Sequence, residues 1–157
     1  LDRPRHPGPI SLGAAVLVAC AAASSGCARQ PAPDLRPDSV LRAELGLTDA
    51  DQVYRVVIRG GRQEELTPSQ VELPDGAWLE FVTADWRVHE VRFEADSLSG
   101  PALAFLTESD QMASPPLVDR DARFVVSFAG APVGRYPFVL EGNRAPARGV
   151  VVVRSNR

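Results

Sequence analysis

The chain has 157 residues, of which 45% are hydrophobic and 24% are charged, and its formal net charge is -3. This composition is typical of a folded protein, and the length suits one domain with appended segments. The arginines are scattered among acidic residues and form no basic stripe, so nucleic-acid binding is not expected.

Residues 1–27 are predicted to be an export signal. Arg3, Arg5 and His6 form a short basic region, and residues 10–23, which follow it, contain no charged residue. An apolar run of this length is too short to cross a ~30 Å hydrocarbon core as a helix, which favours a cleaved signal. An uncleaved anchor is the alternative interpretation.

Both cysteines of the chain lie in this segment. Residues 17–20, Leu-Val-Ala-Cys, resemble the lipobox at which bacterial lipoproteins are lipidated, so Cys20 is the predicted lipidation site. Residues 24–27 make Cys27 the alternative, and a plain secretory signal with incidental cysteines is a further interpretation. The lipobox implies an exported protein that is lipid-anchored on the periplasmic or cell-surface side of a bacterial membrane. The rest of the chain lacks cysteine, which excludes thiolate chemistry and disulfides there.

A tether and a short helix are expected next. Residues 28–37 contain three prolines among polar residues, which is typical of an extended spacer. In residues 38–52, Asp38 or Ser39 is placed to cap a helix and Gly46 to end it, and a turn follows.

Residues 53–154 are predicted to form an all-β domain, because short runs that alternate apolar and polar residues are separated by turns rich in Gly and Pro. The expected strands are residues 53–58, 66–73, 77–83, 89–93, 123–128, 136–140 and 149–153. Residues 97–118 show no clear period, and 103–106 fit a helical turn or a short strand. Seven short strands at this spacing predict a β-sandwich, with the last, valine-rich strand in a central position.

The order of these features resembles the cupredoxin family. Two stretches carry the resemblance, the approach to the first corner and the late hairpin, and they read as follows: residues 67–76, Thr-Pro-Ser-Gln-Val-Glu-Leu-Pro-Asp-Gly, continued by Leu79, Phe81, Asp85 and His89; and residues 134–138, Gly-Arg-Tyr-Pro-Phe, continued by Arg148, Gly149 and Val150. The resemblance covers the folded part of the chain. It implies a Greek-key β-sandwich, here with one short N-terminal helix.

The resemblance also implies where copper ligands would stand. Members that hold a mononuclear copper use a first histidine, which His89 matches, and then a cysteine, a histidine and usually a methionine in the late loop. Near those last three places this chain has Val139, Asn143 and Ala147. Three of the four ligands are therefore absent, and no cofactor is expected.

Two interpretations of His89 are open. In one, His89 binds copper weakly with non-family ligands, for which the candidates are Met112, Asp85, Glu90 and Glu141. In the other, His89 is a partly buried histidine at a strand end that hydrogen-bonds to Asp85 or Asn143. The second interpretation is the one we expect.

No catalytic residues are predicted, since neither a nucleophile motif nor a second histidine occurs after the signal segment, and Glu64 and Glu65 are interpreted as a polar loop. The predicted function is that of a membrane-tethered binding or scaffold module for an envelope protein; copper delivery through His89 is the alternative. The side chains expected at its binding pole are Asp85, Trp86, His89, Glu141, Asn143 and Arg144. Trp86 is interpreted either as an exposed contact residue or as a cap on the core.

Overall fold

A computed structural model describes residues 34–155 of the protein. The predicted export signal, both candidate lipidation sites and most of the predicted tether lie outside these residues. The elements, in chain order, are α1 (Ser39–Leu45), β1 (Val53–Gly60), β2 (Glu64–Thr67), β3 (Gln70–Pro74), β4 (Trp78–Thr83), β5 (His89–Phe93), the 3-10 helix η1 (Ala95–Ser97), α2 (Gly100–Glu108), β6 (Arg123–Ser127), β7 (Gly134–Gly142) and β8 (Ala147–Arg154). No helix within residues 34–155 is long and apolar enough to span a membrane.

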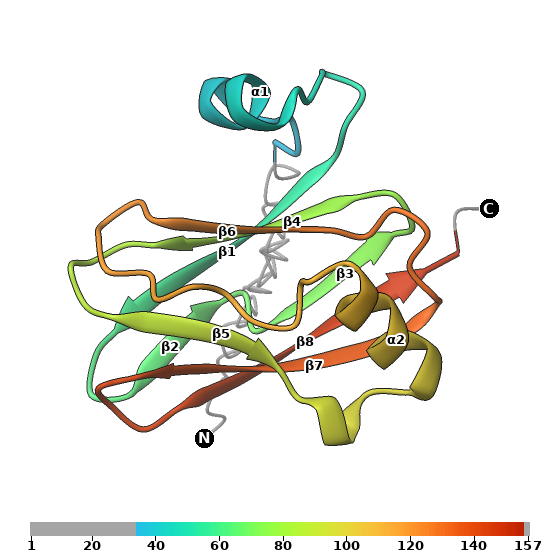
Figure 1. The fold of residues 1–157 in the computed structure, drawn as a ribbon. Helices are drawn as coiled ribbons and strands as arrows, with labels where there is room; N and C mark the ends of the chain where they lie inside the picture. The colour runs from blue at the N-terminus through green and yellow to red at the C-terminus, as the bar shows by residue number, and fades with distance from the viewer. Residues whose placement is uncertain (1–33, 156–157) are drawn as a thin grey trace, which may run out of the picture. The chain divides into compact units, whose positions relative to one another are not determined.

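The strands form two four-stranded sheets that face each other, as Figure 1 shows. The first sheet has the order β2-β1-β4-β6 and the second the order β3-β8-β7-β5. Two strand pairs, β1 with β4 and β3 with β8, are parallel. Between the two strands of each pair the chain leaves the sheet and passes through the other sheet before it returns to form the second strand. The predicted β-sandwich is confirmed, and its valine-rich last strand lies in the interior of its sheet.

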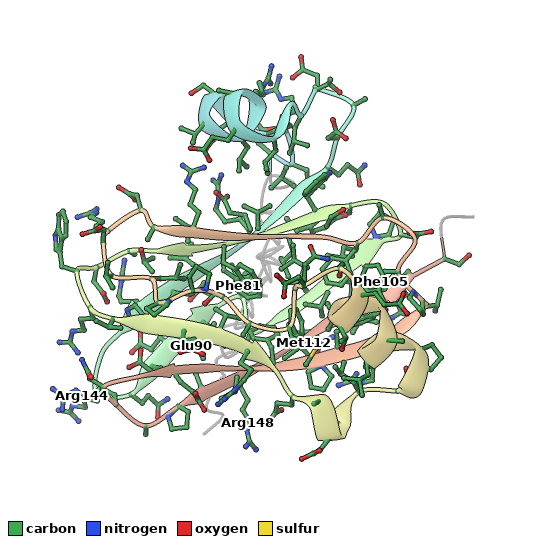
Figure 2. All side chains as sticks on the ribbon, viewed as in Figure 1. Phe81, Glu90, Phe105, Met112, Arg144 and Arg148 are labelled. Atoms are coloured by element: carbon green, nitrogen blue, oxygen red, sulfur yellow. The ribbon has the colours of Figure 1, made fainter. Side chains whose placement is uncertain are left out.

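Alternate residues of the strands fill the space between the sheets. Phe81 on β4 meets Phe138 on β7 edge to face, with 5.0 Å between the ring centroids, and Figure 2 shows Phe81 between the two layers. Both rings are fully buried. Because these positions follow the two-residue period of a strand, the core fixes which side chains point outward at the strand ends.

The helix α1 packs outside the first sheet. Leu41 and Leu47 form a small buried cluster with Val53, against which Trp78 and Val125 of the sheet pack. The side chain of Asp38 caps the helix by accepting from two backbone N–H groups, and Gly46 ends it in the left-handed region. This short helix was expected from the sequence.

One expectation about the strands was wrong. Residues 66–73 were predicted as one strand, but β2 ends at Thr67 and β3 begins at Gln70 in the other sheet; Pro68, which has no N–H for a ladder, lies between them. The helix α2 was predicted only in part, because a helical turn was one of two alternatives for residues 103–106 and the helix runs from Gly100 to Glu108. It is capped by the Ser99 side chain, and a proline stands in its first turn.

Candidate functional site

Four loops meet at one end of the sandwich. They meet there because β1 and β4 run parallel and both end there, β7 also ends there, and β5 and β6 begin there. We call this end the loop pole and define it as residues 60–63, 84–88, 117–122 and 142–146. The predicted binding pole named two of these loops, and the structure adds the other two.

His89 lies at the base of the loop pole and is completely buried. Its Nε2 atom is 2.9 Å from Oδ1 of Asp85, and its Nδ1 atom is 2.9 Å from Oε2 of Glu64. The contact with Asp85 is a hydrogen bond, whereas the Nδ1 N–H is poorly aligned with the Glu64 oxygen. Glu64 is also buried, so the interpretation of Glu64 as part of a polar loop was wrong.

In this Glu64–His89–Asp85 cluster, each ring nitrogen of His89 faces a carboxylate oxygen. The ring therefore lies between two acidic side chains that come from different segments of the chain. The expected hydrogen bond between His89 and Asp85 is confirmed, but the histidine is more deeply buried than the sequence predicted.

Asp85 ties the corner at residues 84–88 to the rest of the fold. Although burial would raise the pKa of its carboxyl, hydrogen bonds from the Gly60 N–H, the His89 ring and the Arg87 N–H outweigh burial and lower that pKa to about 2. The Gly60 contact is 2.6 Å and the Arg87 contact 2.8 Å. The carboxylate thus joins the β1–β2 turn to the corner that carries Trp86.

A glycine lets Glu64 reach the histidine. Gly142 pairs directly with His89, and a Cβ atom on it would lie 2.5 Å from Oε1 of Glu64 and 2.9 Å from the carbonyl oxygen of Val88. No residue with a side chain fits there without displacing Glu64 or the backbone. The close approach therefore depends on the residue at position 142.

The side chains at the loop pole do not fit a type 1 copper site. The ring of His89 is engaged by a carboxylate on each nitrogen, and none of the residues 34–155 is a cysteine. Val139 pairs with Arg92 on the outer side of the second sheet, and Asn143 is exposed in a turn. Within the described part of the chain, no three His, Cys, Asp or Glu side chains are grouped to hold a metal ion.

Met112, the other weak candidate for a metal ligand, is not near His89. Its carbonyl oxygen accepts from the N–H of Phe93 at the far end of β5, four residues from His89, or ~13 Å along a strand. Figure 2 likewise places Met112 well away from Arg144. Met112 lines a hollow of about 600 Å³ outside the second sheet, where Glu141 pairs with Arg92.

Three of the four loops of the pole expose apolar and basic side chains, whereas the 117–122 loop also exposes Asp119 and Asp121. Trp86 is 72% exposed, so the interpretation of Trp86 as a cap on the core was wrong. Val88 and Val118, 45% and 50% exposed, extend the antiparallel pairing of His89 with Leu117 and therefore lie side by side. Asn143 and Arg144 are exposed on the β7–β8 turn, as expected. His89, by contrast, is too buried to contact a partner.

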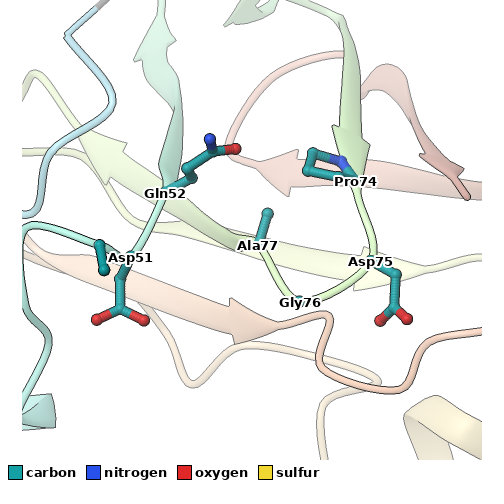
Figure 3. Close-up of a pocket in the computed structure, with 7 residues that line it drawn as sticks. Asp51, Gln52, Pro74, Asp75, Gly76 and Ala77 are labelled. Atoms are coloured by element: carbon teal, nitrogen blue, oxygen red, sulfur yellow. The ribbon is translucent and has the colours of Figure 1, made fainter. Parts of the chain in front are cut away.

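A smaller hollow of about 280 Å³ lies at the opposite end of the sandwich (Figure 3). Its carboxylates, those of Asp51 and Asp75, are already engaged. Asp51 accepts from the backbone N–H of Thr48 at 2.7 Å, and Asp75 accepts from that of Gly130 at 2.8 Å. These contacts stabilise turns, so the hollow presents no convergent polar groups for a ligand.

The two facing sheets give the chain a cupredoxin-like fold, as the resemblance seen in the sequence implied. Similar solved structures include a plastocyanin from the fern Dryopteris crassirhizoma, with 16% identity, a TM-score of 0.48, and coverage of 64% of this chain and 100% of that one. A purple cupredoxin from Nitrosopumilus maritimus has 17% identity, a TM-score of 0.43, and coverage of 64% and 98%. A copper-containing nitrite reductase from Thermus scotoductus has 20% identity and a TM-score of 0.49, with 69% of this chain matching 24% of that one. No family model and no curated protein matches the chain. Such distant similarity concerns the fold and brings no activity to this chain.

Glu64 is the residue of the site that sequence reasoning missed. A weak signal was present, because Glu64 stands two residues before Leu66 and therefore shares its inward face. A buried carboxylate is rare unless a partner is in reach, and that partner, His89, is distant in the sequence.

Proposed function

We propose that this protein is an exported, membrane-tethered binding module that contacts a protein of the cell envelope through the loop pole. The observation that carries the proposal is the exposed indole of Trp86, held on a corner that the buried Glu64–His89–Asp85 cluster braces. The predicted tether and lipid anchor supply its location. The proposed role is binding without catalysis.

Trp86 is suited to contact a partner because of its side chain and because its corner is held rigidly. A large aromatic ring left in water is a frequent anchor of protein interfaces, because covering it removes apolar area and little side-chain freedom is lost. The carboxylate of Asp85 accepts hydrogen bonds from the backbone N–H groups of Gly60 and Arg87, which fixes the corner that carries Trp86. The indole is therefore held in place before binding, so a partner loses little conformational entropy in ordering it. Val88 and Val118 add apolar surface beside it.

Copper delivery through His89 has less support. Binding a metal at either ring nitrogen requires that nitrogen to present a free lone pair and its carboxylate neighbour to move away. Both nitrogens have such a neighbour at 2.9 Å, and Met112 is on another part of the fold. The geometry therefore favours a structural role for His89.

The test is capture of envelope proteins by the full chain and by two variants. Trp86→Ala removes the proposed anchor, and Val133→Ala removes a valine that is 62% exposed in the β6–β7 loop, at the opposite end of the sandwich. We expect a discrete captured protein whose yield falls at least about tenfold with Trp86→Ala and is unchanged by Val133→Ala. Equal yields from both variants, at equal thermal stability, would refute the proposed interface.

A further inference from the structure

We infer that the surface recognised by the loop pole is an acidic patch on a protein, an inference that rests on the proposed function. Three exposed arginines lie on three adjacent loops: Arg62, Arg87 and Arg144. Their adjacency follows from backbone and side-chain contacts. Gln63 bridges to Ala145, which joins the loops of Arg62 and Arg144. The Arg87 side chain lies over the β1–β2 turn, with its guanidinium 3.4 Å from the carbonyl oxygen of Gly61.

These arginines differ from most others in the fold. Many arginines of the described residues pair with a carboxylate within 4.0 Å, for example Arg92 with Glu141 and Arg154 with Glu72. Within residues 34–155, Arg62, Arg87 and Arg144 form no such ion pair, and Figure 2 shows Arg144 directed outward from its turn. Three positive charges thus stand close together in a chain whose net charge is -3.

The acidic groups around the loop pole leave this side basic. Asp85 and Glu64 are turned inward to His89 and do not face solvent as free charges. The exposed acids of the pole itself are Asp119 and Asp121, which flank the exposed Arg120 on the 117–122 loop, and Glu65 lies beside Gly61. The three remaining loops expose no carboxylate among their own residues.

Arginine and tryptophan together are the side chains most enriched at the centres of protein interfaces. A planar guanidinium binds a carboxylate through two parallel hydrogen bonds, so three of them at the same end of the domain as an exposed indole match a partner surface that combines an apolar spot with Asp or Glu. An acidic partner would also be steered to the pole at low ionic strength.

The position of the pole favours a protein over the anchoring membrane. The chain enters the domain where the carbonyl of Leu35 accepts from the N–H of Val53, at the start of β1. The loop pole lies at the end of β1, seven residues further along, or ~23 Å. The loop pole is therefore at the end of the domain opposite to the point where the chain enters it.

The test uses the full chain with Cys20→Ser and Cys27→Ser, which removes lipidation, and a fluorescein-labelled polyglutamate peptide of about 20 residues as the probe. Binding is read by fluorescence anisotropy at 50 and 500 mM NaCl. Arg144→Glu is compared with Arg135→Glu, an exposed arginine on β7 at the opposite end that makes the same change in net charge. We expect Arg144→Glu to weaken binding at least about tenfold, Arg135→Glu less than about twofold, and high salt to weaken binding by the unchanged pole.

Equal effects of the two charge reversals, or binding that salt does not weaken, would overturn the inference. Co-sedimentation with phosphatidylglycerol vesicles forms a second arm, and vesicle binding that Arg144→Glu abolishes would overturn the assignment to a protein. If any of these contrary results is found while capture of an envelope protein still depends on Trp86, the proposed binding function is retained and only the inference of an acidic partner is rejected. If capture does not depend on Trp86, the proposed function itself fails.

Discussion

At the scale of single residues, the centre of the loop pole is the buried histidine between two carboxylates. Replacing Glu64 with glutamine keeps the shape but removes the charge that faces Nδ1 of His89. Removing one partner of a buried charged pair leaves the other without compensation. We therefore expect the free energy of unfolding, measured by urea denaturation at pH 7, to fall by about 3 kcal/mol.

Glu65→Gln is the matched control, because Glu65 is the next residue on β2 and is exposed. It is expected to change stability by less than about 0.5 kcal/mol. A double variant, Glu64→Gln with His89→Gln, should lose less than the sum of the two single changes, since no buried charge is left unpaired. If Glu64→Gln and Glu65→Gln had the same stability, the Glu64–His89–Asp85 cluster would have no energetic role.

The stability contributed by Asp85 should depend on pH in one direction. Its folded-state pKa of about 2 lies below the ordinary value of 3.8, chiefly because the hydrogen bonds from Gly60, His89 and Arg87 outweigh the opposing effect of burial. The stabilisation is therefore present above about pH 4 and is lost as the pH falls to about 2. The stability difference between the unchanged chain and Asp85→Asn, read by urea unfolding, should shrink over that interval. A difference that stays constant from pH 5 to pH 2 would contradict this account.

At the scale of elements, one carboxylate fastens α1 to the sandwich. Asp38 caps the helix and also contacts Arg123 on β6 at 2.8 Å, while Arg123 contacts the buried Glu80 at 2.8 Å. Asp38→Ala should lower stability by about 1 to 2 kcal/mol, since it removes a cap and an ion pair together. Amide exchange in α1 should speed up most. Asp49→Ala, which removes an exposed pair with Arg42, is the control and should cost under about 1 kcal/mol.

The strands could be predicted from the sequence more fully than the helix α2 or the burial of Glu64. The strands and the fold class were accessible because a two-residue period and Gly/Pro turns are local signals. The helix α2 was predicted only in part, as one of two alternatives for residues 103–106, because its nine residues bury only Ala102 and Leu106 and carry no strong period, although Ser99 followed by Pro101 is a usable start signal. The burial of Glu64 could not be predicted, because it depends on a partner, His89, in another sheet and on the absence of a side chain at position 142.

At the scale of the whole molecule, we expect that the protein has a cupredoxin-like fold but does not bind copper. The full chain with both cysteines replaced by serine should retain no stoichiometric copper after titration and desalting, and it should show no visible thiolate charge-transfer band. The measurements are metal content and absorbance. About one copper per chain, lost on His89→Gln, would show that the ring gives up its carboxylate neighbours and would restore the delivery role.

The most direct test of the central claim is photo-crosslinking in cells that express the full, anchored chain. A photoreactive amino acid is placed at position 86 in one strain and at position 133, at the other end of the domain, in another. We expect a discrete crosslinked protein from position 86, whose yield falls when Arg144→Glu is added, and none from position 133. The same adducts from both positions, or none from position 86, would contradict the claim that the loop pole is a binding surface.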